Sequence, residues 1–570
     1  MKRIRTDILI LGAGGAGLFA ALHAHQVAPE LSITVAVKGL LGKCGCTRMV
    51  QGGYNVALAA GDSVERHFMD TIEGGGWLAD QDLAWTLVTK AVERVHELEN
   101  ELGCFFDRNP DGTVHQKAFA GQTFDRTVHK GDLTGIEIIN RLSEQVWARG
   151  IGRLEEHRAI ELVRSADGAS LAGVLMIDMR DGAFVFVQAR AVLLATGGGP
   201  TMYKYHTPSG DKTCDGLAMA LRAGLPLRDM EMVQFHPTGL LAGTGTRMTG
   251  TVLEEGLRGA GGHLLDGDKR RFMERYDPRL ERATRDIVSR SIYAEMRAGR
   301  TSPNGGVYLQ MSHLGVDNVR RQFKGMVERC ADCGFDLAGD LVEVVPTAHY
   351  LMGGVVFAAD CSTPLRGLFA AGEDTGGVHG ANRLGGNGVA NSTVFGGIAG
   401  DRMAAWVRAE GAWIAPEEAA IVASVARHEA PFAQSPGSLE PIRETLFDCM
   451  WNDVGILRTA DGLRRAAATL TELGAQLARV GVADGDRAFN LSWHDWLNLE
   501  SLIAVSRVIA AAALAREDSR GAHYREDHPA ASELATSSYI LVQQQRAALV
   551  IRRERVRFTR VAPGQTVIAE

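Results

Sequence analysis

The stretch Asp7-Ile-Leu-Ile-Leu-Gly-Ala-Gly-Gly-Ala-Gly17 joins a short apolar run to a cluster of glycines. The apolar run 7–11 has the composition of a buried parallel strand. Residues Leu18–His25 then read as a helix, and Ile33–Val37 as a second apolar strand. This order predicts a βαβ unit at the start of the chain.

The glycines of this stretch have the spacing of a dinucleotide-binding turn. Gly12 permits a tight turn, Gly14 allows the backbone to approach a pyrophosphate, and Gly17 allows the helix and strand to come close. The helix start then offers free N–H groups to the anion. The alternative is a glycine-rich turn without a ligand. An acidic residue is expected about 20 residues further on, but Lys38 and Gly39 stand there, so the turn alone does not decide between NAD and FAD.

Length and composition narrow the classes of function. A chain of 570 residues is expected to form several domains, since domains typically hold about 100–200 residues. The formal net charge of −7 disfavours nucleic acid as a partner, because phosphate binding requires concentrated Lys and Arg. The eight cysteines are scattered, which predicts no disulfide framework and favours a reducing, cytoplasmic location.

The sequence indicates no direct insertion into a membrane. The segment Met1–Asp7 lacks the apolar region of a signal peptide. No uninterrupted apolar run reaches the ~18–20 residues that span a bilayer, and Arg507 interrupts the apolar stretch Leu502–Leu514. We therefore expect any membrane association to depend on a partner subunit.

Further elements follow along the chain. Apolar strands are predicted at Ala191–Ala195 and at Gly367–Ala371, each leading into glycine-rich sequence. Residues 238–346 are rich in charge and Arg, which suggests an inserted domain. Apolar residues recur at helical spacing over Leu463–Leu477 and Leu499–Leu514, so the chain beyond about residue 432 is predicted to be mainly helical.

Three later segments identify a family. Met230-Glu-Met-Val-Gln-Phe-His-Pro-Thr-Gly239, Val345-Pro-Thr-Ala-His-Tyr-Leu-Met-Gly-Gly354 and Val378-His-Gly-Ala-Asn-Arg-Leu-Gly-Gly-Asn387 resemble signature segments of the flavoprotein subunits of succinate dehydrogenase and fumarate reductase. Three shorter segments agree in order and approximate spacing: Glu255-Gly-Leu-Arg258 with Gly261-Gly262, Arg285-Asp286, and Arg520-Gly-Ala-His523. The resemblance runs from about residue 5 to about residue 530.

The resemblance implies an FAD-dependent oxidoreductase that interconverts C–C single and double bonds next to a carboxylate. It also implies an α/β fold, in which a Rossmann-like FAD-binding domain carries an inserted α+β capping domain and is followed by a helical domain. The expected boundaries are 1–237 and 347–431 for the FAD-binding domain, 238–346 for the capping domain, 432–530 for the helical domain and 531–570 for a C-terminal segment.

Candidate catalytic residues follow from the resemblance and from the chemistry. Hydride transfer between a carboxylate substrate and a flavin requires cations for the carboxylates and a proton donor opposite the flavin, and the fork of Arg suits carboxylates. By motif, Arg285 would transfer the proton, and Glu255 and Arg258 would relay protons to it. The residues assigned to the substrate are His236, His349, Arg383, Phe119 and Glu254.

The resemblance also supplies a set of FAD contacts. The pyrophosphate would lie against the first glycine turn, the adenosine near Lys38, the ring beside Gln51-Gly-Gly53 and Asn387, and the sugar hydroxyls near Asp215 and Glu373. The full set is Gly12, Ala13, Gly14, Ala16, Gly17, Lys38, Cys46, Thr47, Gln51, Gly52, Gly53, Thr196, Gly197, Asp215, Glu373 and Asn387.

The cysteines bear on the cofactor and on metals. Complex-bound relatives usually show Ser-His-Thr before the Gln-Gly-Gly segment, and that His carries FAD covalently; here the residues are Gly45-Cys-Thr47, so we expect non-covalent FAD. Cys44, Cys46, Cys330 and Cys333 could in principle hold zinc or a cluster. The resemblance instead puts Cys46 at the flavin and Cys330 in the cap, so we expect no metal here and place any iron–sulfur cluster on a partner subunit.

Glu254 departs from the family pattern. Relatives carry Thr-Glu where this chain has Glu254-Glu255, and the Thr hydroxyl contacts a substrate carboxylate. An ionised Glu can only accept hydrogen bonds. The substrate could carry a cation, hydroxyl or amide there, Glu254 could be protonated, or it could point away while Arg247 or Thr251 takes over. We favour the first hypothesis, a mono-carboxylate or a substituted dicarboxylate.

Two alternatives of function remain open from the sequence. An L-aspartate oxidase-like enzyme is favoured by the missing His. An inactive flavin-binding assembly protein is disfavoured by the presence of His236, His349, Arg285 and Arg383.

Overall fold

A mostly parallel sheet forms the centre of the protein. We describe residues 1–243, 246 and 248–569 of the computed structural model. The parallel strands β6, β2, β1, β9 and β16 are extended by an antiparallel pair, β8 and β7. Their bounds are β1 Lys2–Leu11, β2 Ile33–Val37, β6 Gly152–Glu155, β7 His157–Arg164, β8 Leu171–Asp178, β9 Ala183–Leu194 and β16 Leu368–Ala370. The predicted second strand is confirmed residue for residue, whereas β9 begins earlier than predicted because its first half pairs with β8.

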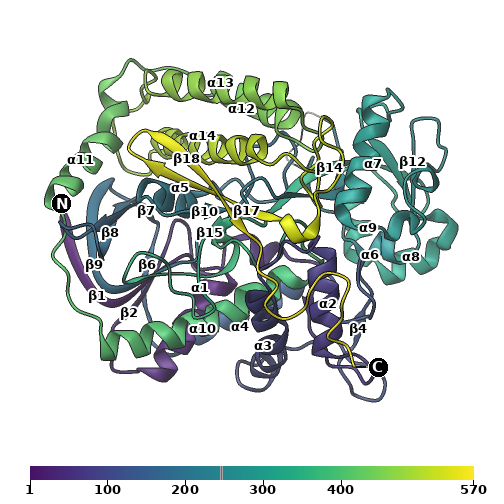
Figure 1. Ribbon diagram of the computed structural model, residues 1–570, viewed down its shortest axis with the longest axis horizontal. Helices are drawn as coiled ribbons and strands as arrows, with labels where there is room; N and C mark the ends of the chain where they lie inside the picture. Colours follow the sequence, from purple (N-terminus) through teal and green to yellow (C-terminus); the bar gives the residue numbers. More distant parts are fainter. Residues whose placement is uncertain (244–245, 247, 570) are drawn as a thin grey trace.

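Two helices, α1 (Gly15–Val27) and α10 (Asn387–Ala409), lie together against one face of the sheet (Figure 1). A Cβ on Gly17 would lie 1.9 Å from the Gly12 carbonyl oxygen, and one on Gly396 would lie 2.5 Å from the Ala16 oxygen. Side chains at these positions would therefore separate α1 from the turn and from α10. The helix starts three residues earlier than predicted because the glycines themselves form its first turn.

Residues in the predicted inserted region form a second layer with its own core. The antiparallel sheet order is β11-β14-β13-β12, with helices packed on it at one end of the molecule (Figure 1). The bounds are β11 Val233–Leu240, β12 His263–Leu265, β13 Val307–Gln310, β14 Leu341–Leu351, α6 Gly256–Gly259, α7 Arg285–Arg297, α8 Val316–Gln322 and α9 Lys324–Ala331. This confirms the α+β architecture expected for the cap.

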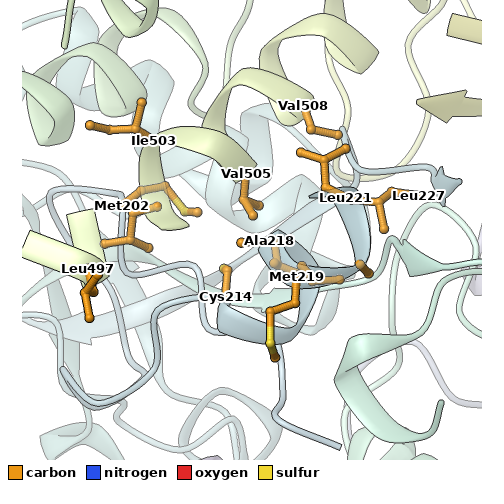
Figure 2. Packing of buried hydrophobic residues seen from close by; sticks show 14 of the residues in the cluster. Met202, Cys214, Ala218, Met219, Leu221, Leu227, Leu497, Ile503, Val505 and Val508 are labelled. Carbon is orange, nitrogen blue, oxygen red and sulfur yellow. The ribbon is translucent and has the colours of Figure 1, made fainter. Parts of the chain in front are cut away.

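The later part of the chain is helical, as predicted. It contains α11 (Glu418–Glu429), α12 (Glu440–Asp453), α13 (Ala460–Leu477) and α14 (Leu491–Ala515). Helix α14 begins earlier than predicted because Asn490 caps it, accepting a hydrogen bond from the Trp493 N–H at 2.8 Å. Figure 2 shows Val505 and Val508 of α14 next to Ala218 and Leu221 of α5 (Asp215–Arg222), while Leu497 of α14 lies near Met202.

Among the described residues, α14 alone is long and apolar enough to cross a membrane by length and composition. Of its most apolar 18-residue window, 67% is buried inside the protein, and a core helix passes the same test. The burial of α14 between α13, α5 and strand β17 (Ser538–Gln545) identifies it as a core helix here.

Smaller elements complete the fold. The chain ends in a hairpin, β17 (Ser538–Gln545) and β18 (Ala548–Arg555), that joins β10 (Leu227–Arg228) and β15 (Gly354–Val355) in a four-stranded sheet. A three-stranded sheet near the site holds β3 Tyr54–Asn55, β4 Gln116–Lys117 and β5 Thr127–Val128, beside helices α2 Val64–Gly74, α3 Gln81–Asn100 and α4 Thr134–Ala148.

Candidate active site

The carboxyl ends of four parallel strands meet at one edge of the central sheet. Gly12 follows β1, Lys38 follows β2, Thr196 follows β9, and Glu373 follows β16. In open α/β sheets ligands bind at this edge. The fold therefore brings together residues predicted to contact the cofactor, although they lie up to about 360 positions apart in the sequence.

The glycine turn has the geometry of a phosphate cradle. Gly12 has φ +113°, and a Cβ there would lie 2.1 Å from the Ala195 carbonyl oxygen. A Cβ on Gly14 would meet no closer atom than Thr47 Oγ1 at 3.6 Å, and one on Gly197 would meet nothing within 4 Å. Gly14 borders a cavity that is also lined by Ala13, Lys38, Thr196, Thr213 and Asp215. The backbone here fits an FAD pyrophosphate.

Asp215 is held as an anion at the far end of this cavity. Lys38 Nζ lies 2.9 Å from one of its oxygens and Arg158 Nη2 lies 2.8 Å from the other. Burial raises the pKa of Asp215, but Arg158 and Lys38 together lower it by more than burial raises it. The net pKa is therefore well below its usual range. Lys38 and Asp215 were both predicted at the cofactor; Arg158 was not, since an Arg near the start of strand β7 belongs to no motif.

Two neighbouring carboxyl groups lie deeper along the same edge. Glu373 accepts hydrogen bonds from the N–H groups of Leu351 (3.0 Å) and Gly199 (3.4 Å), and burial raises its pKa to about 7. Asp374 accepts from the N–H groups of Thr196 and Gly197, and burial raises its pKa to about 6. Sequence reasoning selected Glu373 and missed Asp374, although both follow the same strand.

The segment expected beside the flavin ring runs over the start of helix α1. Thr47 Oγ1 accepts a hydrogen bond from the Gly15 N–H at 3.1 Å. A Cβ on Gly52 would lie 2.6 Å from the Phe119 ring, and Gly53, with φ +141°, approaches the Val128 carbonyl. The close backbone packing explains the Gly-Gly pair that follows Gln51.

The resemblance places Cys46 where complex-bound relatives usually carry the linking His. Burial raises the pKa of its thiol to about 12, with Glu373 adding to the shift, so the group is protonated at neutral pH. Among the described residues, no cluster of three or more His, Cys, Asp or Glu side chains could hold a metal ion.

Asn387 is fully buried at the start of α10. Its side-chain oxygen accepts from Asn55 Nδ2 and faces His67 Nε2, both at 2.9 Å, and its Nδ2 donates to Thr71 at 3.1 Å. The amide thus joins α2, β3 and α10. Its contact with the flavin stays a prediction.

The predicted proton-transfer residues form a continuous chain in the cap. Arg285 Nη2 and Nε lie 2.6 and 3.0 Å from Glu255 Oε2, and Arg258 Nη2 lies 3.3 Å from Glu255 Oε1. Burial raises the pKa of Glu255, but Arg285 and Arg258 lower it to a net value below normal. Arg258 is fully buried and also donates to the Glu281 carbonyl at 2.6 Å.

Gln234 connects this chain to the substrate residues and was not predicted. Its Oε1 accepts from Arg285 Nη1 at 3.1 Å, and its Nε2 donates to the Arg383 carbonyl at 2.7 Å. The sequence could have predicted Gln234. It lies two residues before His236 in β11, and therefore on the same face of the strand.

His236 and His349 face one another from β11 and β14, with ring centroids 5.4 Å apart. Burial, followed by the charge of Arg285, lowers both pKa values well below normal, so both imidazoles are neutral. His236 Nδ1 lies 3.3 Å from the Thr238 N–H, which as a donor fixes the proton of His236 on Nε2. Thr207 Oγ1 lies 2.7 Å from His349 Nδ1.

Arg383 is a buried cation that lies beside Tyr350. It stacks 4.4 Å from the Tyr350 ring centroid, its Nε has no hydrogen-bond partner, and it forms no ion pair with a described residue. Burial, with the charge of Arg285, lowers its pKa to about 10, which still leaves it charged at neutral pH.

Phe119 separates the cap residues from the flavin-side segment. A Cβ on Gly385 would lie 2.6 Å from Glu255 Oε2, 2.7 Å from Phe119 and 3.1 Å from Arg285 Nη2. Glycine at this position lets the backbone close the site.

Glu254 points to a lysine that sequence reasoning missed. Lys117 Nζ lies 3.3 Å from Glu254 Oε2, with the two side chains 19% and 7% exposed. Arg247, one residue expected to replace the Thr contact, lies outside the described residues; Thr251, the other, accepts a hydrogen bond from the Leu240 N–H through its carbonyl.

A parallel sheet edge with a glycine turn, joined to a site of buried arginines and neutral histidines, is the arrangement expected of a flavin-dependent oxidoreductase. Residues 7–389 match the FAD binding domain family, and residues 443–568 match the fumarate reductase flavoprotein C-terminal family. The chain belongs to the succinate dehydrogenase and fumarate reductase flavoprotein family, and its function is that of an FAD-dependent oxidoreductase acting on CH–CH groups.

Similar proteins cover nearly the whole chain. A subunit of the CoM/CoB fumarate reductase of Methanothermobacter marburgensis is 40% identical over 533 residues, which are 92% of this chain and 94% of that protein. The succinate dehydrogenase flavoprotein subunit of Coxiella burnetii is 35% identical over 92% of each chain. The structure of FrdA from a mutant of the E. coli quinol fumarate reductase superposes with a TM-score of 0.93 at 33% identity, covering 99% of both chains.

Proposed function

We propose that this protein reduces a carbon–carbon double bond next to a carboxylate, with Arg285 as the proton donor to the substrate carbon. The observation that carries the proposal is the continuous chain Arg285–Glu255–Arg258 beside Arg383, a buried cation that forms no ion pair within the described part of the chain.

The substrate carboxylate would bind to Arg383 and to the two neutral histidines. Arg383 offers the positive charge, and His236 offers an Nε2–H donor. Because these groups are buried and preorganised, they bind an anion without first giving up a protein partner. They fix the neighbouring alkene close to Arg285.

The bound flavin supplies hydride transfer, and the protein supplies the proton. An Arg is a poor acid in water because its pKa is above ~12. Glu255 lies between Arg285 and Arg258, so a proton that Arg285 gives to carbon can be replaced through Glu255 from Arg258. Gln234 holds the third Arg285 nitrogen and keeps the guanidinium plane oriented.

We infer that FAD is bound without a covalent link. The residues that would hold it are those around the Gly12–Gly17 turn, Lys38, Asp215 and Glu373. Cys46 replaces the linking His, and its high thiol pKa makes it a poor nucleophile. Non-covalent FAD implies a lower potential than in covalent relatives, which favours alkene reduction.

A partner protein is the remaining part of the proposal. The relatives are named as subunits of fumarate reductases and a succinate dehydrogenase. We infer that the partner is an iron–sulfur electron-transfer subunit. We also infer a cytoplasmic location, with attachment to the inner face of a membrane through that partner.

The test is anaerobic turnover of the purified holoprotein with a reduced artificial dye and a panel of unsaturated carboxylates. Dye oxidation that depends on the carboxylate supports the proposal. An L-aspartate oxidase-like activity, the alternative, would instead give peroxide aerobically with L-aspartate. Absence of reduction with every carboxylate would refute the proposed reaction.

A further inference from the structure

We propose that Lys117 and Glu254 together select a substrate that carries a neutral donor–acceptor group, of the carboxamide class, where fumarate has its second carboxylate. This inference rests on the proposed function and names the substrate class of the same site.

The ion pair lies beside Phe119, a residue that the resemblance assigns to the substrate. Lys117 Nζ lies 5.7 Å from the Phe119 ring centroid. That ring in turn borders Gly385, whose Cβ position is 2.6 Å from Glu255. Glu254 directly precedes Glu255 at the start of α6, so the pair and the proton chain flank the same ring.

Both members of the pair keep unused hydrogen-bonding capacity. An ammonium has three N–H donors; Lys117 donates to the Gly131 carbonyl at 3.4 Å and to Glu254 at 3.3 Å. An ionised carboxylate accepts at several positions, and Lys117 is the hydrogen-bond partner found for Glu254 among the described side chains. The pair thus offers one donor and one acceptor side by side.

A carboxamide matches this arrangement and a carboxylate does not. The amide oxygen can accept from Lys117 while the amide N–H₂ donates to Glu254. A carboxylate can accept from Lys117, but its second oxygen would face the like charge of Glu254. The substrate class is therefore an α,β-unsaturated mono-carboxylate with a distal primary amide or an equivalent group.

The charged surroundings support this choice. Asp132 and Arg329 face Glu254 from the loop before α4 and from α9, and Arg329 also lies next to the side-chain amide of Gln51. His129 lies on the Lys117 side, and burial, followed by Lys117, lowers its pKa to about 4, so it adds no charge. Lys117 and Arg329 are thus the cations next to Glu254 in the described part of the chain.

The experiment compares fumarate with its monoamide, fumaramate, as oxidants of the dye-reduced holoprotein. We expect kcat/KM for fumaramate to exceed that for fumarate by about 10–100-fold, mostly through KM, because one charged hydrogen bond and one repulsion distinguish them. In Glu254→Gln this ratio should fall by at least about tenfold. Lys117→Met should lower kcat/KM for both compounds, and Lys130→Met, which removes a neighbouring lysine paired with Asp107, should leave the ratio unchanged.

Two outcomes distinguish failure of this inference from failure of the proposed function. Equal or faster reduction of fumarate by the wild type, with no change of ratio in Glu254→Gln, overturns this inference and leaves the proposed function standing. Reduction of neither compound, nor of any carboxylate in the panel, overturns both.

Discussion

Arg285 and Glu255 are joined by two hydrogen bonds, of 2.6 and 3.0 Å, to a single carboxylate oxygen, Oε2. The second oxygen, Oε1, is left to Arg258 at 3.3 Å. Each oxygen of Glu255 therefore contacts one arginine, so the carboxylate lies between the two guanidinium groups.

Replacing Arg285 with Gln should abolish turnover and spare the cofactor. Loss of a general acid costs about 10²–10⁴-fold in rate, and Arg285 has no contact with the glycine turn that would hold FAD. Steady-state kinetics and the flavin content of Arg285→Gln and Arg285→Lys check this. Arg290→Gln is the matched control, since Arg290 lies one turn further along α7 and bonds Asp286 and the Gly521 carbonyl instead. Near-normal turnover in Arg285→Gln would remove Arg285 from the mechanism.

Much of the candidate site could be predicted because its residues lie in sequence motifs. The order strand, glycine turn, helix fixes where Gly12 and Gly14 lie, since one local geometry satisfies that sequence. His236 follows from its motif, and Gln234 could have followed from the period-two pattern of β11.

The Lys117–Glu254 contact could not be predicted in this way. The two residues lie 137 positions apart and come from different layers of the fold. Lys117 belongs to the two-residue strand β4, whose pairing with β5 no sequence pattern indicates. The start of α14 was also missed, although Trp493, Trp496 and Leu497 have helical spacing and Asn490 caps the helix, so this part of the helix could have been predicted.

The flavin should be released by acid. Because the Cys46 thiol is protonated at neutral pH and no His stands at this position, precipitation with acid should leave the yellow chromophore in the supernatant. Absorbance of supernatant and pellet measures this. Cys46→Ser should show the same release and similar flavin content, whereas chromophore that stays with the wild-type pellet and not with Cys46→Ser would show a thioether link.

Arg516 should be a major source of stability. It is buried and lies 2.5 Å from Glu231 and 3.2 Å from Asp229, so it ties the end of α14 to the segment before β11. Removing one partner of a buried pair leaves an unpaired charge and costs about 3–5 kcal/mol. Arg516→Met should therefore lower the free energy of unfolding by this amount in denaturant titrations. Arg408→Met, which breaks the exposed pair with Glu30, should cost much less, because solvent screens an exposed ion pair; equal effects of the two variants would contradict the structural role.

The preference for fumaramate over fumarate should shrink as the pH falls. Burial raises the pKa of Glu254, and Lys117 lowers it by less, so the net pKa is above the ordinary value for Glu. A raised pKa means that Glu254 takes up a proton at a higher pH than an exposed glutamate would. Once neutral, it becomes a donor as well as an acceptor, and the repulsion of the second fumarate carboxylate disappears.

We therefore expect the ratio of kcat/KM for fumaramate over fumarate to fall as the pH is lowered through the raised pKa of Glu254, with the change confined mainly to KM for fumarate. Glu254→Gln cannot ionise at this position, so its ratio should be flat over the same pH range once the protonation of fumarate itself, measured separately, is taken into account. Lys117→Met should move the transition to higher pH, because it removes the charge that favours ionised Glu254. A ratio in the wild type that is independent of pH, or one that changes equally in Glu254→Gln, would show that Glu254 does not face the distal end of the substrate.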